Sequence, residues 1–433
     1  MLKKDEITEK KSGPRFTFGP QARLIALCWF VYTFSYLGRY SFSSNITNIM
    51  DRFGVLHEDA GLVTTFFFFA YGAGQFINGL LCKKYNKKIL FPAVLLVTSL
   101  ANIAVFSGLP FHVIKYVWLI NGIAQSVLWS SIVNILTENL DEKHLKTALV
   151  VLGSTTAVGT FITYFASFLF TELGDFMLIF PFAAAVLLAV AVTWAVTFEP
   201  TCRRIKGTNA VSTGSLSSGG PAPVKGEEPA QAFGKATNSA GKFTKTMVLT
   251  VMVFALFAVI CNFLKDGLQT WVPGMLKDIY GLGDSVAILV SLILPLISGL
   301  CGAFTVFAQK YIKNPVLLTA SFFTLCVGLS VLLKVLIGLS FIVSAFIFAL
   351  ISFMSHCINT CITVVIPFHF KNSGRSGLIS GILNGCCYAG STISAYGLGS
   401  AADNFGWDAA IILFVALSSI AAVIGFVSFR LFK

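Results

Sequence analysis

Twelve long stretches of apolar residues, separated mostly by short polar segments, dominate this sequence. A helix needs about 20 apolar residues to cross the hydrocarbon of a bilayer. Charged residues make up only 12% of the 433 residues, whereas soluble chains carry about 25%. The sequence therefore predicts an all-α polytopic membrane protein with twelve transmembrane helices. We expect these helices at 24–49, 60–82, 89–107, 113–137, 145–170, 177–198, 246–273, 285–309, 315–333, 335–366, 376–400 and 409–429.

One connection is much longer than the others. Residues 199–245 are rich in Gly, Ser, Thr, Ala and Pro, a composition that cannot bury a core. We expect a flexible cytoplasmic linker here, between an N-terminal six-helix bundle at 24–198 and a C-terminal six-helix bundle at 246–430. Residues 1–23 are expected to form a cytoplasmic tail.

The two halves show a weak internal repeat. A shift of 226 residues places Arg39 on Lys265, and the same shift places Lys84-Tyr85 on Lys310-Tyr311. One shift thus aligns both the cations inside the spans and a basic loop. Such a repeat favours two parallel six-helix halves related by an axis along the membrane normal.

The charge distribution predicts the orientation in the membrane. The chain has 31 Lys and Arg against 19 Asp and Glu, a formal net charge of +12. Of the 31 cations, 25 fall in segments that the proposed spans place on one side, and four fall in the opposite loops. Positive loops mark the cytoplasmic side. We therefore expect a plasma membrane protein with both termini in the cytoplasm and no nucleic-acid partner.

Two cations lie inside predicted spans. Arg39 is about 15 residues into the first span, roughly 22 Å along a helix, and Lys265 takes the equivalent place in the seventh. A charge at this depth costs at least ~2.5–3.5 kcal/mol, so both should face a water-filled cavity or a charged partner. Together they suit a small organic anion, and their spacing does not distinguish phosphate from carboxylate.

Two further ionisable residues leave alternatives open. Asp266 follows Lys265 directly, and adjacent helical positions point about 100° apart. It is either a proton-coupling carboxylate in the cavity or a partner at a helix interface. For His356 a hydrogen-bonded packing role is the first interpretation, and contact with substrate or proton is the second. Further candidates for lining the cavity are Tyr32, Tyr36, Tyr71, Gln75, Gln125, Trp129, Thr156, Asn262, Asn384 and Tyr388.

Signs of enzymatic or metal chemistry are missing from the sequence. It contains no P-loop, no H-E-x-x-H, no G-x-S-x-G and no dinucleotide-binding motif. The ten cysteines include no C-x-x-C pair, and nine lie within or at the ends of apolar spans, as expected for packing residues. We therefore expect no cofactor, no metal and no enzyme activity.

Several motifs resemble one transporter family. YLGRYSFSSNI, which contains Arg39, is similar to the first-helix motif of the organophosphate:phosphate antiporters, the glycerol-3-phosphate and hexose-phosphate carriers of the major facilitator superfamily. NFLKDGLQTWVPGML resembles their seventh-helix motif, with Lys265 where an Arg is usual. AYGAGQFINGLLCKKY, NGIAQSVLWSS and SGILNGCCYAGSTISAYGLG resemble their second, fourth and eleventh helices.

This resemblance implies the major facilitator fold and alternating access, with Arg39 and Lys265 gripping the phosphoryl group of the substrate. Departures from the family pattern narrow the range of expected substrates. Gln75 and Tyr40 stand where glycerol-3-phosphate carriers have Lys, and Thr156 stands where they have His. Because this site is less cationic, we do not expect glycerol 3-phosphate itself. A bulkier or less charged phosphoester, or a carboxylate, fits better.

Three functions follow in order of preference. The first is a monomeric secondary transporter that exchanges a phosphate ester for inorganic phosphate. The second is a proton-coupled symporter of an organic anion, using Asp266 or His356. The third is a sugar-phosphate sensor that does not transport, since the antiporter family includes such a sensor.

Overall fold

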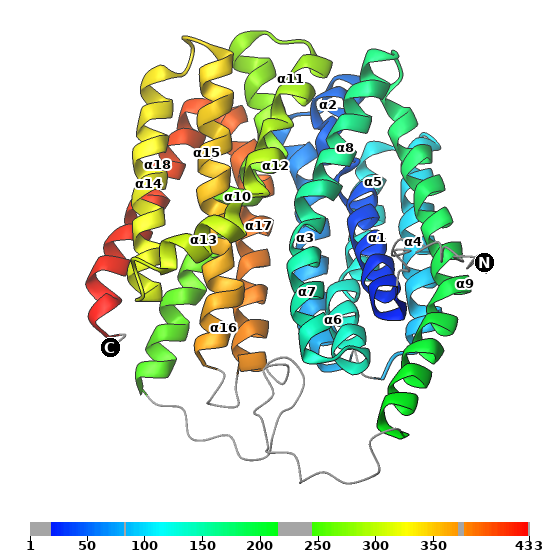
Figure 1. Cartoon of the computed structure of the whole chain (residues 1–433). Coiled ribbons are helices and arrows are strands. Elements are labelled where there is room, and N and C mark those ends of the chain that lie inside the picture. Colours follow the sequence, from blue (N-terminus) through cyan, green and yellow to red (C-terminus); the bar gives the residue numbers. More distant parts are fainter. Residues whose placement is uncertain (1–18, 82–83, 215–244, 371–375, 432–433) are drawn as a thin grey trace, which may run out of the picture.

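The computed structural model describes residues 19–81, 84–214, 245–370 and 376–431, and every regular element within them is a helix. Each of the twelve predicted spans has a helical counterpart. Figure 1 shows these helices standing side by side as a long bundle. Helices are the expected solution, because a helix satisfies its own backbone polar groups where no water is present.

The first six passes form the N-terminal half, and some are divided into two or three helices. They are α1 (Pro20–Tyr40) with η1 (Ser43–Asn45) and α2 (Ile46–Phe53), α3 (His57–Leu81), α4 (Lys87–Phe106), α5 (Phe111–Gln125) with α6 (Leu128–Asn139), α7 (Glu142–Gly153) with α8 (Thr155–Glu172), and η2 (Phe176–Leu178) with α9 (Ile179–Gly214).

The next six passes form the C-terminal half. They are α10 (Lys245–Tyr280), α11 (Asp284–Ser291) with α12 (Ile293–Ser298) and α13 (Cys301–Gln309), α14 (Pro315–Leu336), α15 (Phe341–Thr360) with the π-helical turn η4 (Cys361–Val365) and α16 (Ile366–His369), α17 (Ser376–Phe405), and α18 (Trp407–Ser428).

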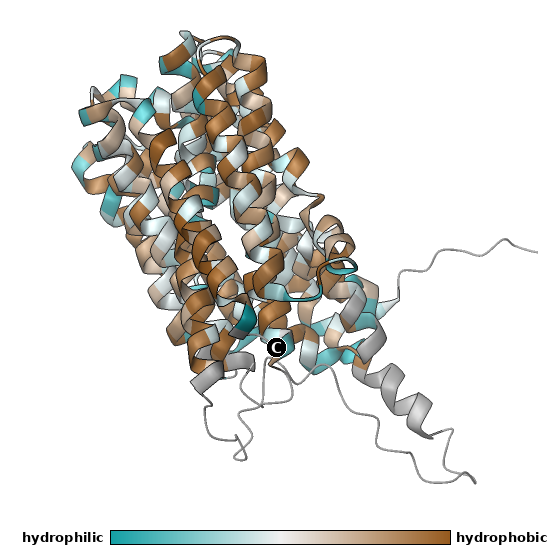
Figure 2. Cartoon of the chain, turned by 90° about the vertical axis from the view of Figure 1, so that its left-hand side faces the viewer, coloured by the Kyte–Doolittle hydropathy of each residue, from teal (hydrophilic) through white to brown (hydrophobic). Residues whose placement is uncertain are grey.

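Ten of these passes are long and apolar enough to cross a membrane, with mean hydropathy between 1.4 and 2.7. The other two are α1, which carries Arg39, and α17, which is rich in Gly and Ser. Hydrophobic residues run along the helices, and hydrophilic residues gather toward their ends (Figure 2). The predicted all-α polytopic fold is confirmed.

Two boundaries differ from the predictions. The linker expected at 199–245 begins as helix, because α9 continues to Gly214. Its remaining part, 215–244, lies outside the described residues, as do residues 1–18 of the expected tail. The first helix begins earlier than expected, at Pro20, a residue that suits the first turn because its missing N–H has no partner there anyway.

Local signals repeat in the two halves. Gly54 ends α2 with φ of 63°, and Gly281 follows α10 with φ of 65°, a left-handed conformation that glycine adopts without strain. Asn86 begins α4 by accepting a hydrogen bond from a backbone N–H two residues on, and Asn314 does the same for α14. The first and third passes of each half thus have matched ends.

The two halves meet along a few helices. α3 packs along α17, α8 packs against α11 and α12, and α2 packs against α10. We call the end that holds α2 and the start of α3 the closed end; it lies at the top of Figure 1. The opposite end, where α1 begins and α18 ends, is the open end.

Close backbone contact joins the halves toward the closed end. A Cβ atom on Gly61 would lie 2.3 Å from the carbonyl oxygen of Ala395, and one on Gly399 would lie 2.6 Å from that of His57. Only glycine fits at such distances. Farther along the two helices, a Cβ on Gly72 would lie 2.6 Å from the Cβ of Tyr388. The helices α3 and α17 therefore approach each other closely at several points.

Charged residues reinforce this contact. The carboxylate of Asp403 on α17 accepts hydrogen bonds from the first two backbone N–H groups of α3 and lies 2.6 Å from Nδ1 of His57. The other ring nitrogen of His57 lies 2.9 Å from Asp278 on α10. Lys277 also contacts Asp51 on α2. A carboxylate of one half thus caps a helix of the other, where the helix dipole favours it.

Candidate functional site

Arg39 lies on α1, buried with 5% of its surface exposed. Its guanidinium carbon is 4.3 Å from the ring centre of Tyr71, 4.8 Å from that of Tyr36 and 5.6 Å from that of Phe67. Its Nε donates a long hydrogen bond of 3.5 Å to Oε1 of Gln125. The charge is thus held mainly by aromatic faces, which attract cations through the ring quadrupole.

The charge of Arg39 has no counter-charge among the described residues. Its Nη2 is buried and makes no hydrogen bond there, and no described carboxylate lies within ion-pair distance. A buried donor without an acceptor carries its full desolvation cost. An anion that accepts hydrogen bonds from the guanidinium would remove that cost.

Gln125 is oriented by its neighbours on the same helix and beyond. Its Nε2 donates to Oδ1 of Asn121 at 3.0 Å, and Nδ2 of Asn121 donates to the carbonyl of Gly38 at 2.8 Å. Because its amide nitrogen is engaged, Gln125 presents its oxygen to Arg39. The N-terminal half therefore positions this guanidinium through α1, α3 and α5.

Three further predicted residues cluster around Tyr36, which also contacts Arg39. The hydroxyl groups of Tyr36 and Thr156 are 2.8 Å apart. The ring of Tyr32 packs against Tyr36 at 5.6 Å and against Trp129 at 5.1 Å, between ring centres. The structure thus links Tyr36, Thr156 and Trp129 into one aromatic and hydroxyl-rich surface beside Arg39.

Tyr71 connects the two halves. The hydroxyl of Tyr71 accepts a hydrogen bond from Nε2 of Gln75 at 3.0 Å. Gln75, a predicted site residue, therefore contacts a ring that itself contacts Arg39. Its ring lies 4.7 Å from the ring of Tyr388 on α17. Tyr388 therefore brings the C-terminal half to the side chains that surround Arg39.

Lys265 differs from Arg39 in having a partner. Its Nζ lies 3.1 Å from Oδ1 of Asp266, and their side chains are 17% and 6% exposed. The second carboxylate oxygen of Asp266 accepts a hydrogen bond from Ser391, which lies three residues after Tyr388 on α17. Tyr71 contacts Tyr388 across the halves, and Tyr388 and Ser391 lie on the same helix, so α17 connects the surroundings of Arg39 with the Lys265–Asp266 pair.

The remaining predicted residues are not joined to either cation by a hydrogen bond. Asn262 donates to Asn359 at 3.4 Å. Nδ1 of His356 is 2.8 Å from the carbonyl of Ser352 on its own helix, in keeping with a packing role. Asn384 is half-buried and makes no side-chain hydrogen bond within the described part of the chain.

Sequence reasoning missed three residues of this site: Phe67, Asn121 and Ser391. Phe67 belongs to a run of four phenylalanines, and nothing in the run indicates which ring meets Arg39. Ser391 stands among other small residues of α17, where its bond to Asp266 has no local signal. Only the polarity of Asn121 within an apolar span could have drawn attention to it.

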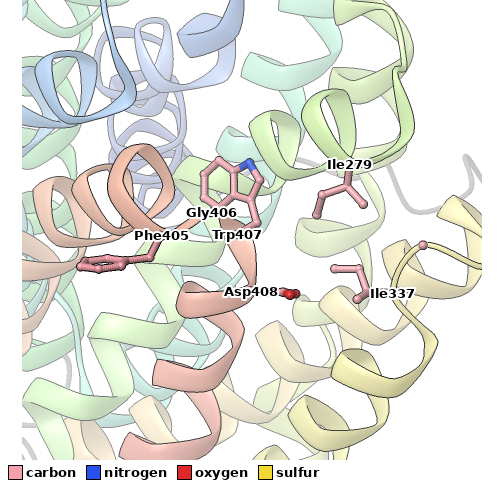
Figure 3. A pocket seen from close by; sticks show the side chains of 7 residues that line it. Ile279, Ile337, Phe405, Gly406, Trp407 and Asp408 are labelled. Carbon is pink, nitrogen blue, oxygen red and sulfur yellow. The ribbon is translucent and has the colours of Figure 1, made fainter.

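A separate cavity of about 270 Å³ lies in the C-terminal half near the closed end, lined by the residues drawn in Figure 3. Its walls include Ile279, Ile337 and Trp407. Its one carboxylate, Asp408, lies 2.6 Å from Nζ of Lys334. No cation lines this cavity, so its lining does not suit an anion.

The fold is that of a membrane transporter built of two pseudo-symmetric halves. Residues 28–395 match the Major Facilitator Superfamily, and the chain belongs to this family. The predicted resemblance to its organophosphate branch is supported by the relatives described next.

Curated relatives are similar over short segments. The chain is 24% identical over 108 residues to the membrane sensor protein UhpC of Escherichia coli (strain K12), covering 25% of this chain and 24% of that protein. It is 28% identical over 119 residues to the probable hexose phosphate transport protein of Chlamydia muridarum (strain MoPn / Nigg), covering 27% and 26%. The chain thus spans about a quarter of the length of these relatives.

Solved structures resemble the whole chain. A bacterial homolog of the human lysosomal transporter Spinster, in an inward-facing and occupied conformation, aligns with a TM-score of 0.68 and 14% identity over 95% of this chain and 97% of that one. Its inward-facing and unoccupied form aligns with a TM-score of 0.65 and 15% identity, over 96% and 98%. These similarities establish the fold.

Proposed function

We propose that this chain is a secondary transporter of a small organic anion, in particular a phosphate ester exchanged for inorganic phosphate. The observation that carries the proposal is the buried guanidinium of Arg39, which lacks a counter-charge among the described residues. Its planar fork matches the oxygens of a phosphoryl group. The hexose phosphate transport protein among the relatives supports this substrate class.

The proposed mechanism is alternating access by rocking of the two bundles, 24–198 and 246–430. With the site empty, the charge of Arg39 opposes its enclosure between the halves, because burial of an unpaired charge is costly. A bound anion neutralises that charge and permits closure. After one anion is released, the carrier can return only with a second anion bound, so the protein exchanges one anion for another.

The proposal includes an orientation. The open end faces the cytoplasm of a cell bounded by its plasma membrane, and the closed end faces outward, as the distribution of Lys and Arg predicts. The protein works as a monomer, with lipid around it and no cofactor. In this orientation the contacts of His57 and Asp403 seal the outward side.

Counterflow tests the proposal directly. Purified protein is reconstituted into liposomes loaded with phosphate, and uptake of labelled phosphate or glucose 6-phosphate is measured. We expect uptake that depends on internal phosphate and is lost in Arg39→Ala. Arg52→Ala is the matched control, because Arg52 is an exposed arginine of α2. Uptake by Arg39→Ala at the wild-type rate would contradict the two-cation site.

A proton-coupled symporter is the second candidate, favoured by the contact of Asp266 with both Lys265 and Ser391. A carboxylate in this position can exchange its proton with the cavity while Lys265 turns to the substrate. This mechanism predicts anion uptake driven by a pH gradient without internal phosphate. The gradient-driven uptake should be lost in Asp266→Asn.

A sensor is the third candidate, favoured by the relatives named membrane sensor protein in Escherichia coli and Salmonella typhimurium. A sensor would bind sugar phosphates through Arg39 without moving them. Binding by thermal shift, together with the absence of both counterflow and gradient-driven uptake, would favour this role.

A further inference from the structure

A histidine at the closed end is held between two carboxylates of the opposite half. His57 is the first residue of α3. Its Nδ1 lies 2.6 Å from Oδ1 of Asp403 on α17, and its Nε2 lies 2.9 Å from Oδ2 of Asp278 on α10. The ring packs beside Trp271 and Trp407, at 5.6 Å and 5.2 Å between ring centres. Both polar contacts thus cross from the N-terminal half to the C-terminal half.

The two contacts identify the protonation state that fits this geometry. A neutral imidazole has one donor nitrogen and one acceptor nitrogen, whereas an ionised carboxylate only accepts. With a neutral ring, one nitrogen of His57 would direct its lone pair at a carboxylate oxygen. The imidazolium ion instead donates from both nitrogens, to Asp403 and to Asp278. The closed contact is therefore complete only while the ring carries its second proton.

Other donors hold both carboxylates in place. Asp278 accepts a hydrogen bond of 2.8 Å from Nε1 of Trp407. Asp403 accepts hydrogen bonds from the backbone N–H groups of His57 and Glu58, at 3.3 Å and 2.8 Å. These donors orient the carboxylate oxygens independently of the imidazole. The proton on the ring is then the variable part of the cluster, because histidine titrates near neutral pH whereas aspartate does not.

The charged groups around this cluster do not substitute for the imidazolium ion. Lys277 on α10 contacts Asp51 on α2 and lies 2.9 Å from Asp284 on α11, so its charge is shared between those carboxylates. Arg52 on α2 is exposed to solvent, and Glu58 adds a further acidic group on α3 itself. The cation that joins α3 to α10 and α17 is therefore the protonated histidine.

We propose that His57 is a pH-dependent latch: its imidazolium ion holds the closed end shut, and loss of one proton allows this end to open. The proposal rests on the alternating access of the proposed function, because opening of the closed end must move α3 away from α10 and α17. That movement separates the ring from both carboxylates at once. The latch is thus distinct from the anion site around Arg39.

The direction of the pH effect follows from linkage. The closed state holds the second proton of His57 between two anions, whereas the open state leaves the ring to water. The closed state therefore binds this proton more tightly, and a rise in pH shifts the population toward the open state. At low pH the ring is protonated in both states, and the contact contributes in full. Its contribution is lost as the pH rises through the range in which the histidine of the closed state titrates.

Hydrogen–deuterium exchange of the full chain, measured by mass spectrometry without substrate, tests the latch. Exchange at the start of α3, where two backbone N–H groups contact Asp403, is corrected for the intrinsic rate. It is compared at about pH 6 and about pH 9, on either side of the ordinary range of histidine. We expect exchange roughly tenfold faster at the higher pH, because a hydrogen bond between charged groups is lost. Helix α14, within the C-terminal half, is the internal reference and should not change.

Three variants separate the charge from the fold. His57→Gln cannot carry the charge, so its corrected exchange should be fast at both pH values. His57→Lys is still a cation at about pH 9, so exchange should stay slow at both. His112→Gln is the matched control, because His112 is an exposed histidine in the first turn of α5, at the same end of the bundle. It should behave like the unmodified chain.

Other results would overturn the proposal. Equal corrected exchange at both pH values in the unmodified chain would show that the proton does not hold the closed end, and this comparison needs no variant. A pH effect that persists in His57→Gln would place the titrating group elsewhere. Faster exchange of α14 in step with α3 would show general loosening instead of opening at one end. Because no substrate is present, a failure to exchange phosphate in counterflow leaves this result unchanged, and the two proposals are tested separately.

Discussion

The two halves place a cation at equivalent positions of the repeat but treat it differently. Arg39 is surrounded by aromatic rings and has a guanidinium nitrogen without a partner. Lys265 is 3.1 Å from Asp266, whose other oxygen is bound by Ser391. The N-terminal half thus keeps its charge available, and the C-terminal half largely neutralises its own. Sequence symmetry between the halves does not imply equal shares in anion binding.

This difference predicts unequal contributions of Arg39 and Lys265 to the affinity for the anion. Anion binding at Arg39 replaces no existing ion pair, whereas binding at Lys265 competes with Asp266. The three charges give the site a net charge of one positive unit. We therefore expect Arg39 to supply most of the affinity, and Lys265 to contribute only as far as it leaves Asp266.

The largest expected effect is that of Arg39→Ala. Truncating one partner of a buried, hydrogen-bonded charge pair costs about 2–5 kcal/mol, so substrate affinity should fall roughly 30-fold or more. Arg39→Lys keeps the charge but loses the planar fork, and it should recover only part of the affinity. Thermal-shift titration with glucose 6-phosphate measures both, with Arg52→Ala as the exposed control.

The two cations would contribute equally to anion binding if Arg39→Ala and Lys265→Ala lost the same affinity. The proposed competition with Asp266 would also fail if Lys265→Ala/Asp266→Ala bound the anion no better than Lys265→Ala. Lys265→Ala leaves the carboxylate of Asp266 buried without its cation, which costs more than loss of the pair. We expect the single change to weaken binding by roughly tenfold to 100-fold, and the double change to regain about tenfold of that loss. Titration of Lys265→Ala, Asp266→Ala and the double change beside the unmodified protein gives the coupling energy.

Asp266→Asn is expected to strengthen anion binding, in contrast to the two changes above. Removing the carboxylate frees Lys265, so a doubly charged anion should bind a few-fold to about tenfold more tightly, equivalent to at most ~1.4 kcal/mol. Release should slow accordingly. Equilibrium titration and counterflow rates are compared on the same preparation. Weaker binding in this variant would show that Asp266 orients Lys265 rather than competes for it.

The sequence was sufficient for the fold because the membrane imposes strong rules. Twelve apolar stretches of this length are expected to become helices, and an arginine or lysine at mid-span is costly unless it faces a water-filled cavity or a charged partner. Arg39 and Lys265 could therefore be singled out from the sequence as candidate site residues. The end of α9 could not be predicted, because the residues up to Gly214 are polar enough to be expected in a linker.

The differing environments of the two cations were beyond the sequence. Neighbouring positions on a helix diverge by about 100°, which left open whether Asp266 reaches Lys265. The long lysine stem makes the contact possible, and Ser391 from another helix fixes the carboxylate. Likewise, the ring of Tyr71 on α3 lies next to the guanidinium of Arg39 on α1, a contact that arises only when the chain folds. Contacts between distant segments carry no local signal in a single chain.

The smallest expected effect is that of Ser391→Ala. The change removes one hydrogen bond to a charged acceptor, worth about 1.5–3 kcal/mol to stability, but Asp266 keeps its contact with Lys265. The apparent melting temperature should therefore fall by a few degrees, while affinity for the anion changes by less than about threefold. Ser394→Ala is the matched control, since Ser394 is a buried serine one turn away that donates to a backbone carbonyl. If Ser391→Ala instead changed affinity as much as Asp266→Asn does, Ser391 would be the residue that sets how far Lys265 is neutralised. The asymmetry between the halves would then depend on α17 rather than on the adjacent pair in α10.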